Sequence, residues 1–368
     1  MLCSSVNTDA LVHNAKELCV RSQKKLIAVL KHDAYSCGAA ECAAALEGSA
    51  YAFACESVEE ALRIRAAAPK KRIFVLAPID KSASFEQQGG IILPADGLDI
   101  IDALCDIYIG KREISIRVDV CNSGEGLHPR DFERALAKIE SSESLRLYSV
   151  FAHAPSLYRG GGEETRREFF ELCKKARRLN RRVICHLATS ASWQTETLPF
   201  DAVRIGTNLF GLPSFSAQDT SFLRPVASLF SKIERIIETS GAVSFYDCEH
   251  SVGEGARLGI VSAGYGYLPC LIGKKQIPLL INGKRVKTVG SIYMGHILVD
   301  LSEAANAREG DTAILVGKSG GERITAEEFA ESCGISVCRC EGALFTTRGA
   351  QRIVVSNESC IIGREGAK

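Results

Sequence analysis

The first chemically unusual residue in the sequence is a lysine that ends an apolar run. The stretch AVLKHDAYSCG covers residues 28–38, so that Lys31 directly follows apolar residues and Tyr35 comes four positions later. A cation at the end of a buried strand is costly unless its ammonium reaches water, loses its proton or forms a covalent bond. The stretch therefore indicates a lysine at the mouth of a strand, and the rest of the chain has to decide between these three possibilities.

Further polar side chains stand at the ends of other apolar runs. They include Arg117, His153, His186 and Arg204. The carboxyl ends of parallel strands meet at one edge, so these side chains are expected to surround Lys31. Either histidine alone would ordinarily be a satisfied structural residue, but their joint arrival at strand ends favours a catalytic or cofactor-binding site.

Eight short β-rich runs, separated by helical patterns, are predicted to position these groups. The runs are 25–30, 51–55, 72–78, 90–94, 113–120, 147–154, 182–188 and 200–206. Amphipathic helices lie between them, one with a capping-box start at Ser57. Strands that are apolar on both faces and alternate with helices predict an α/β fold, a parallel (β/α)8 TIM barrel over residues 1–225. An open doubly wound sheet is the alternative.

From residue 226 the pattern changes to short β-branched runs broken by turn residues. The clearest case is PLLINGKRVKTV, residues 278–289, in which Asn282 and Gly283 separate two alternating runs and predict a hairpin. One helix is predicted around residues 326–332. The sequence therefore predicts a second, mainly antiparallel β domain over residues 226–368.

Composition narrows the class of partner. The 368 residues include 45 basic and 44 acidic side chains, a net charge of +1 that gives no reason to expect nucleic acid or an anionic membrane. No apolar stretch approaches the roughly 20 residues of a membrane helix, and the N-terminus lacks a signal-peptide profile, so we expect a cytoplasmic protein.

The 15 cysteines are scattered, which indicates free thiols. Cys338 and Cys340 have no second pair at zinc spacing, so no metal is expected.

A series of motifs resembles those of alanine racemases, barrel enzymes that use pyridoxal 5′-phosphate (PLP). Besides the lysine stretch, they are NTDALVHN near the N-terminus, VFAHA around His153, HLATS around His186, VRIGTNLFGL around Arg204, GIVSAGYGY around Tyr265 and VGSIYM ending at Met294. They cover nearly the whole chain in family order. The resemblance implies a PLP-dependent isomerase that racemises alanine or a related small amino acid.

The requirements of the cofactor agree with this resemblance. PLP needs an amine that is neutral part of the time in order to form an imine, and Lys31 at a barrel mouth can supply one. The phosphate needs hydroxyls and backbone amides, which Tyr35, Ser190 and the Gly206–Thr207 turn can supply beside the last strand. The alternative for Ser190 and Thr207 is that they are ordinary loop hydroxyls.

The resemblance places Arg204 opposite the pyridine nitrogen. A permanently charged guanidinium does not give that nitrogen a proton, so the ring is a weaker electron sink and proton removal depends on well-placed bases. The resemblance also implies a hydrogen-bonded chain of tyrosine, histidine, arginine and histidine. Tyr246, His153, Arg204 and His186 are available for it, with His153 beside the cofactor and His186 behind Arg204.

Racemisation requires a proton-transferring group on each face of Cα. The resemblance implies that Lys31 serves one face and that a tyrosine from the β domain of a partner subunit serves the other, hence a head-to-tail homodimer. Counting back without a gap from GIVSAGYGY places Tyr246 at that tyrosine and Tyr265 at a second tyrosine near the substrate. Matching on the letters VS would instead place Phe245 there, which leaves no second base.

The sequence departs from the family pattern where the substrate carboxylate is held. The arginine that usually follows the aspartate of the fifth strand is replaced by Gly124, five residues after Asp119. Arg117, at the end of the same strand, is the candidate substitute for binding substrate. It could equally pair with Glu125.

Two further departures surround the substrate entrance. The usual Met-Asp pair is Met294-Gly295, with Met294 still assigned to substrate binding, and the C-terminal tyrosine that reaches the phosphate is replaced by Cys338 or Cys340. These changes leave two alternatives open. The chain could act on a different amino acid or carry out a different Cα reaction, or it could bind PLP with little turnover.

Overall fold

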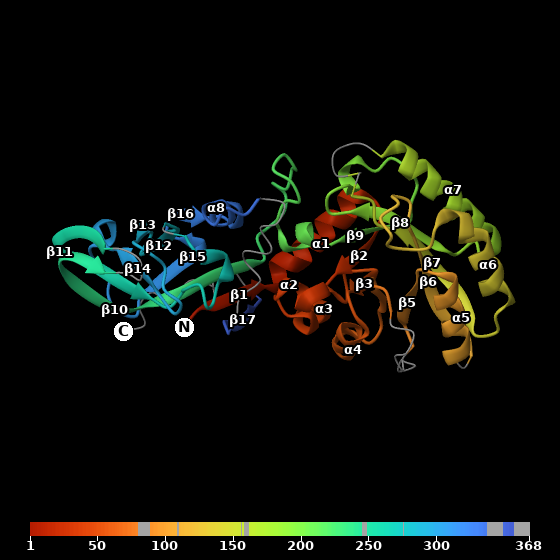
Figure 1. The fold of residues 1–368 in the computed structure, drawn as a ribbon, viewed down its shortest axis with the longest axis horizontal. Helices are drawn as coiled ribbons and strands as arrows, with labels where there is room; N and C mark the ends of the chain where they lie inside the picture. Colours follow the sequence, from red (N-terminus) through yellow and green to blue (C-terminus); the bar gives the residue numbers. More distant parts are fainter. Residues whose placement is uncertain are drawn as a thin grey trace. The chain divides into compact units, whose positions relative to one another are not determined.

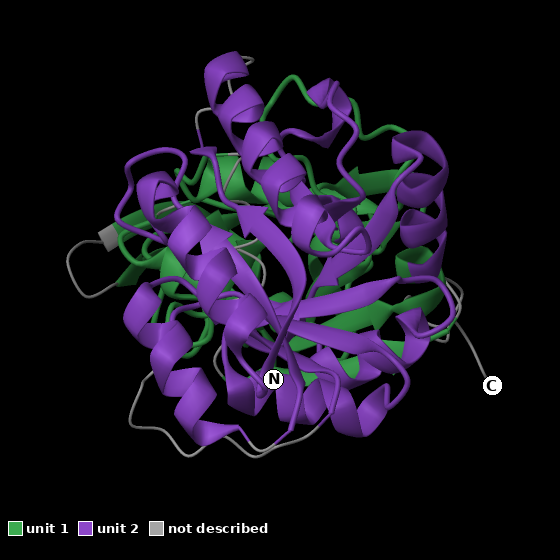
Figure 2. Ribbon diagram, turned by 90° about the vertical axis from the view of Figure 1, so that its right-hand side faces the viewer, with its two compact units in different colours: residues 1–11, 35–37, 210–368 green, residues 12–34, 38–209 purple. Residues whose placement is uncertain are grey.

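The computed structural model describes residues 1–79, 89–108, 110–155, 157, 162–244, 249–274, 276–336 and 349–356. The chain divides into two compact units, which Figure 2 colours separately. The barrel unit comprises Val12–Ala34 and Gly38–Leu209, and the sheet unit comprises Met1–Leu11, Tyr35–Cys37 and Phe210–Lys368.

The barrel unit contains a closed ring of eight strands. Figure 1 shows strands of this ring together with the helices around them. In ring order they are β2 (Lys25–Val29), β3 (Ala52–Cys55), β4 (Arg72–Val75), β5 (Ile91–Ala95), β6 (Arg112–Val118), β7 (Leu145–Ala152), β8 (Ile184–Thr189) and β9 (Ala202–Ile205). All neighbours are parallel, and β9 pairs with β2 to close the ring. The predicted barrel is confirmed, and this closing pair excludes the open sheet.

Helices alternate with the barrel strands, as the amphipathic patterns predict. They are α1 (Thr8–Ser22), α2 (Lys31–Tyr35), α3 (Ala39–Leu46), α4 (Val58–Ala67), α5 (Leu98–Ile107), α6 (Phe132–Ser141) and α7 (Glu163–Leu179), with short 3-10 turns η1 (Pro129–Asp131), η3 (Trp193–Thr195) and η4 (Thr207–Phe210). Ser57 caps α4 by accepting a hydrogen bond from Glu60 N at 3.3 Å. No helix among the described residues is long and apolar enough to cross a membrane.

The barrel interior is a packed apolar core. Its central cluster includes Ile27, Phe74, Ile92 and Ile184, each contributed by a different strand. These side chains fill the interior of the barrel, whereas the polar residues of the site lie at the carboxyl ends of the strands.

The sheet unit is built on a nine-stranded sheet in the order β16-β15-β12-β13-β14-β11-β10-β1-β17, with a further pairing of β15 and β10. Its strands are β1 (Cys3–Asn7), β10 (Ala227–Ser244), β11 (Glu249–Val261), β12 (Pro278–Ile281), β13 (Lys284–Val289), β14 (Ile297–Asp300), β15 (Thr312–Ser319), β16 (Glu322–Ile324) and β17 (Gln351–Val355). Every pair is antiparallel except β1–β17. The prediction of a mainly antiparallel β domain is confirmed.

Local predictions in this unit also hold. Asn282 and Gly283 join β12 to β13 with φ values of 49° and 75°, the left-handed pair that a two-residue hairpin requires. The predicted helix at 326–332 is α8 (Ala326–Ser332), capped by Thr325, which accepts a hydrogen bond from Glu328 N. Two 3-10 turns, η5 (Pro269–Leu271) and η6 (Ser302–Ala304), also lie in the described part of this unit.

The structural division differs from the predicted one at residues 1–225 and 226–368. Residues 1–11 group with the sheet because β1 lies between β10 and β17 and pairs with both, and residues 210–225 belong to the same unit. A five-residue strand whose partners lie more than 200 positions along the chain has no local signal, which is why the pattern analysis missed it.

Gly211 gives a test of close packing in the sheet unit. Its φ is +79°, and an added Cβ would lie 2.1 Å from the carbonyl oxygen of Arg224. Gly273 has a similar φ of +71° with nothing within 4 Å of its Cβ position. Both alanine variants incur left-handed strain of about 1–2 kcal/mol, and overpacking adds roughly 1–3 kcal/mol at Gly211 only. Urea denaturation should therefore show Gly211→Ala to be the less stable variant, and equal midpoints would contradict the contact.

Candidate active site

The carboxyl ends of the barrel strands surround a cavity of about 510 Å³. Its charged and titratable lining consists of Lys31, Glu56, Arg117, Glu125, His153 and Arg204. The structure thus brings together four of the residues that the sequence singled out, each from a different strand end. Glu56 is an addition that the sequence analysis did not name.

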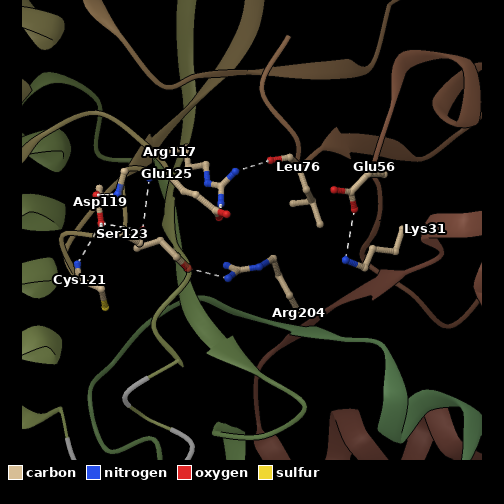
Figure 3. Close-up of polar contacts among 11 residues, drawn as sticks. Lys31, Glu56, Leu76, Arg117, Asp119, Cys121, Ser123, Glu125 and Arg204 are labelled. Carbon is tan, nitrogen blue, oxygen red and sulfur yellow. Dashed lines mark hydrogen bonds and ion pairs between the residues drawn. The ribbon is translucent and has the colours of Figure 1, made fainter. Parts of the chain in front are cut away.

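Lys31 begins α2 at the end of β2, and its side chain points toward Glu56 (Figure 3). The distance from Lys31 Nζ to Glu56 Oε2 is 3.2 Å, and both side chains are about one-third exposed, at 36% and 37%. The ammonium therefore reaches the open cavity and has a counter-ion there. The Lys31 side chain therefore reaches solvent, which is one of the three possibilities for a lysine at a strand end.

The backbone after Lys31 is a turn of left-handed helix. His32, Asp33 and Ala34 have φ values of 51–55°, and Tyr35 and Ser36 continue at 55° and 63°. None of these residues is glycine, and left-handed helix costs L-residues roughly 1–2 kcal/mol each. The turn persists because other groups hold its backbone.

Those holding contacts are hydrogen bonds on both sides of the turn. Ala34 N donates to Leu30 O at 2.9 Å, and Gly38 N donates to Asp33 O at 2.9 Å. The Asp33 carboxylate accepts a bond from Ala39 N at 2.8 Å. The turn is thereby tied to the strand before it and to the first residue of α3.

Glu60 is a second acidic residue that the sequence analysis interpreted only as part of a capping box. Its side chain does not return to Ser57 N. Instead, one oxygen accepts a hydrogen bond from Asp33 N at 3.2 Å and the other from Glu56 N at 2.9 Å. This buried carboxylate therefore joins the loops that carry Lys31 and its counter-ion.

Arg204 is fixed by backbone carbonyls at the end of β9. Its Nη2 donates to Ala152 O at 2.6 Å and to Leu187 O at 3.4 Å, and its Nη1 donates to His186 O at 2.8 Å. The ladder between β8 and β9 shifts register between His186 and Thr189, within which two of these carbonyls lie. The guanidinium thus donates hydrogen bonds to carbonyl oxygens where the ladder between β8 and β9 is interrupted.

The predicted link between Arg204 and His186 is present. Arg204 Nη1 lies 2.7 Å from His186 Nδ1, and the imidazole stacks on Phe151 with ring centroids 5.4 Å apart. Complete burial, followed by the Arg204 charge, holds the pKa of His186 well below its usual range. His186 is therefore neutral and accepts from the guanidinium.

His153 lines the same cavity, with an exposed edge. Removal of the ring from water by the surrounding protein, followed by the charges of Arg204 and Arg117, lowers the pKa of His153 to about 4. The third link, Tyr246, lies outside the described residues, as does the competing Phe245.

Arg117 pairs with Glu125, which was one of its two expected roles. Its Nη2 contacts Glu125 Oε2, and its Nη1 donates to Leu76 O at 3.2 Å (Figure 3). The Arg117 side chain is 9% exposed, whereas that of Glu125 is 61% exposed. Gly124 lies in the loop that delivers Glu125, and nothing approaches within 4 Å of a Cβ built on it.

The remaining predicted residues fall into separate groups. In the barrel unit, buried Ser190 accepts a hydrogen bond from Gly206 N at 3.0 Å, and Thr207 begins η4 immediately afterwards. In the sheet unit, the Tyr35 ring packs edge-on against Phe210 with centroids 5.3 Å apart.

The predicted substrate residues of the sheet unit are neighbours. Tyr265 N donates to Tyr293 O at 3.1 Å and Gly266 N donates to Met294 O at 2.8 Å, which joins the loop of Tyr265 to that of Met294. The Met294 side chain is exposed.

Cysteines and metal ligands form no further centre in the described ranges. No disulfide joins the described cysteines, and no three histidine, cysteine, aspartate or glutamate side chains there converge to hold a metal ion. Cys338 and Cys340 lie outside these ranges.

Comparison with known proteins identifies similar chains. Residues 6–214 match the family model for the N-terminal domain of alanine racemase, and residues 226–341 match that for its C-terminal domain. An alanine racemase from Nostoc sp. is 30% identical over 347 residues, 89% of each chain.

Solved structures are similar over nearly the full length. The biosynthetic alanine racemase of Pseudomonas aeruginosa has a TM-score of 0.80 and 25% identity, covering 96% of this chain and 99% of that one. An alanine racemase from Bartonella henselae with covalently bound pyridoxal phosphate has a TM-score of 0.80 at 21% identity, with the same coverage, and shares the fold.

Substitution of Glu60 tests whether it ties the two loops together. Glu60→Ala leaves the Asp33 and Glu56 amides without acceptors, at about 1–3 kcal/mol for each that stays buried. We expect a loss of roughly 1–4 kcal/mol in the free energy of unfolding, measured in urea. Glu59→Ala, in the same turn of α4 but exposed, should change it by less than about 0.5 kcal/mol. Equal losses would contradict this role.

The pKa of His153 predicts a pH dependence of stability. Because folding lowers it from 6.5 to about 4, the unfolded chain binds more protons between these values, and stability should fall as pH falls from about 6.5 to 4. His186 acts in the same direction. His153→Asn should make the decline shallower, by less than the roughly 1.4 kcal/mol per pH unit of a fully buried group, since its ring is partly exposed. Identical slopes in chemical denaturation would refute the shift.

Proposed function

Because the chain belongs to the alanine racemase family, we propose that it is a PLP-dependent isomerase that interconverts L- and D-alanine, or a related small amino acid. The observation that carries this proposal is the convergence of Lys31 and Arg204 in one cavity at the strand ends. An amine beside a permanently charged guanidinium is the pair that this chemistry needs.

The residues of the barrel unit fit the cofactor by the chemistry of their donors. Lys31 offers an amine that is open to the cavity, Arg204 a guanidinium locked on carbonyls, and Ser190 a hydroxyl beside the Gly206 amide at the end of the last strand. PLP, when bound, supplies an aldehyde that reacts with the amine and a ring that withdraws electrons from Cα. The residues proposed to hold it are Lys31, Tyr35, His153, Ser190, Arg204, Gly206 and Thr207.

Arg204 sets the electronic character of the site. Its guanidinium is held by the carbonyls of Ala152, His186 and Leu187, so it cannot turn away, and it does not give up a proton. It therefore opposes protonation of a ring nitrogen facing it. The reaction then depends on local bases rather than on wide delocalisation of charge.

Lys31 is proposed to carry a proton on one face of Cα. The carboxylate of Glu56, 3.2 Å from Nζ, helps to position the Lys31 side chain in the cavity. Glu60 fixes the separation of the two groups through their backbones.

The second proton carrier is proposed to be Tyr246 of the partner subunit. This assignment rests on the ungapped spacing to GIVSAGYGY in the sequence. It implies a homodimer in which the sheet unit of one protomer completes the cavity of the other, with Tyr265, Met294 and Arg117 around the substrate. We propose that this dimer acts in the cytoplasm.

A second candidate is the same chemistry on another amino acid. It is favoured by Gly124, which stands where the family has an anchoring arginine and leaves open space around its Cβ position.

Exchange in heavy water tests the function directly. Purified protein with PLP and L-alanine in D2O should yield D-alanine that carries deuterium at Cα, detected by mass spectrometry after chiral separation. Tyr246→Phe should slow conversion in both directions, because the equilibrium between the enantiomers is fixed, and should suppress Cα deuterium exchange less for the enantiomer whose proton Lys31 removes. Exchange confined to other amino acids would favour the second candidate, and a cofactor spectrum without any exchange would rule out racemisation.

Covalent capture tests the role of Lys31. Borohydride treatment of the protein with PLP should add the mass of the reduced cofactor to the wild type and none to Lys31→Ala. Addition of equal mass to both proteins would place the reactive amine elsewhere.

A further inference from the structure

A racemase must hold the carboxylate of its substrate, yet the arginine placed to do so already holds a carboxylate. Arg117 lines the cavity, and its Nη2 contacts Glu125. The inference drawn from this contact rests on the proposed function, because it concerns how an amino acid enters that site.

Arg117 keeps its position without help from Glu125. It lies in β6, its side chain is 9% exposed, and Nη1 donates to Leu76 O at 3.2 Å. Its Nε is buried and has no hydrogen-bond partner among the described residues. A guanidinium in this condition attracts any carboxylate that can reach it, because a buried donor without an acceptor is costly.

The loop that presents Glu125 is tightly constructed up to that residue. The Asp119 carboxylate accepts hydrogen bonds from Cys121 N, Ser123 N and Gly124 N at 2.7–3.1 Å, and from Ser123 Oγ at 3.0 Å. Partial burial raises the pKa of Asp119, but the hydrogen bonds from Ser123, Gly124 and Cys121 together outweigh it and hold the pKa below its usual range, so this carboxylate stays ionised.

The base of the loop is closed by backbone bonds. Leu127 N donates to Arg117 O at 2.8 Å, and Asp119 N donates to Leu127 O at 3.0 Å. Gly126 has a φ of +136°, and a Cβ there would lie 2.9 Å from Asp119 N. The backbone of Glu125 is therefore set, whereas its side chain, 61% exposed, can turn into water.

We propose that Glu125 is a placeholder for the substrate carboxylate. In the empty site its carboxylate satisfies Arg117, and an entering α-amino acid exchanges its own carboxylate for that of Glu125, whose side chain turns out to solvent. Glu125 thus competes with the substrate for Arg117 and sets the affinity of the site for carboxylates. The pairing lowers affinity for every carboxylate equally and keeps other anions from the guanidinium.

The alternative is that Glu125 is a permanent partner that holds Arg117 in place for the substrate. The two roles predict opposite effects. Removing a competitor strengthens carboxylate binding, whereas removing a support weakens it. The Leu76 contact and the exposure of Glu125 favour the competitor.

Calorimetric titration of propionate, which is alanine without its amine, into the full chain with PLP separates these roles. Glu125→Gln should bind propionate roughly two- to fivefold more tightly than the wild type, the range that a weak exposed ion pair contributes. The KM for alanine should fall by a similar factor with kcat little changed. Arg117→Gln should lose propionate binding.

Glu133→Gln is the matched control. Glu133 is an exposed carboxylate that pairs with Lys175 outside the cavity, so its removal makes the same change in net charge. It should leave propionate affinity and KM unchanged. Any gain shared by both variants would be a general charge effect and would overturn the placeholder role.

The titration also separates this inference from the proposed function. Tighter propionate binding by Glu125→Gln without racemisation would support the placeholder and refute the racemase. Racemisation with unchanged or weaker propionate binding would refute the placeholder alone. No propionate binding by either protein would show that Arg117 is not a carboxylate site and would refute the inference.

Discussion

The pairing of β2 with β9 is the constraint on which the candidate site depends. In that ladder Ile27 lies opposite Arg204 and Ala28 opposite Ile205, although the two strands are separated by nearly the whole barrel sequence. Lys31 follows β2 by two residues, so closure of the ring brings an amine and a guanidinium to the same rim. In an open sheet the first and last strands would not be neighbours, and the two groups would not lie at the same site.

Three cations share the described part of the rim, and each is satisfied in a different way. Lys31 faces a carboxylate from the next strand, Arg117 faces one from its own loop, and Arg204 faces backbone carbonyls. The two ion pairs include partly exposed side chains and can separate when a ligand arrives, because exposed pairs are weak. The carbonyl contacts of Arg204 are buried and cannot rearrange without opening the barrel.

The parts of the structure that follow from local pattern could be predicted from the sequence. Apolar runs of strand length predicted the eight barrel strands, and Asn282-Gly283 predicted a hairpin, because each of these signals lies within a few residues. β1 could not be found in this way, since its partners are distant in sequence. Glu60 was interpreted from its spacing to Ser57, but its oxygens are drawn to two amides that only the folded barrel brings near. The role of Arg117 could not be predicted from the sequence, because an arginine serves an internal ion pair and a contact with a ligand equally well. The assignment of Tyr246 stays a prediction.

The left-handed turn after Lys31 limits how this enzyme can diversify. The five consecutive L-residues that follow Lys31 adopt positive φ, a conformation that β-branched side chains avoid. Few substitutions at residues 32–36 are therefore compatible with the fold, whichever amino acid the site prefers as its substrate. In the loop between Asp119 and Leu127, Glu125 has no such backbone restriction. Substitutions that adapt the site to new substrates are therefore tolerated best on that side of the rim.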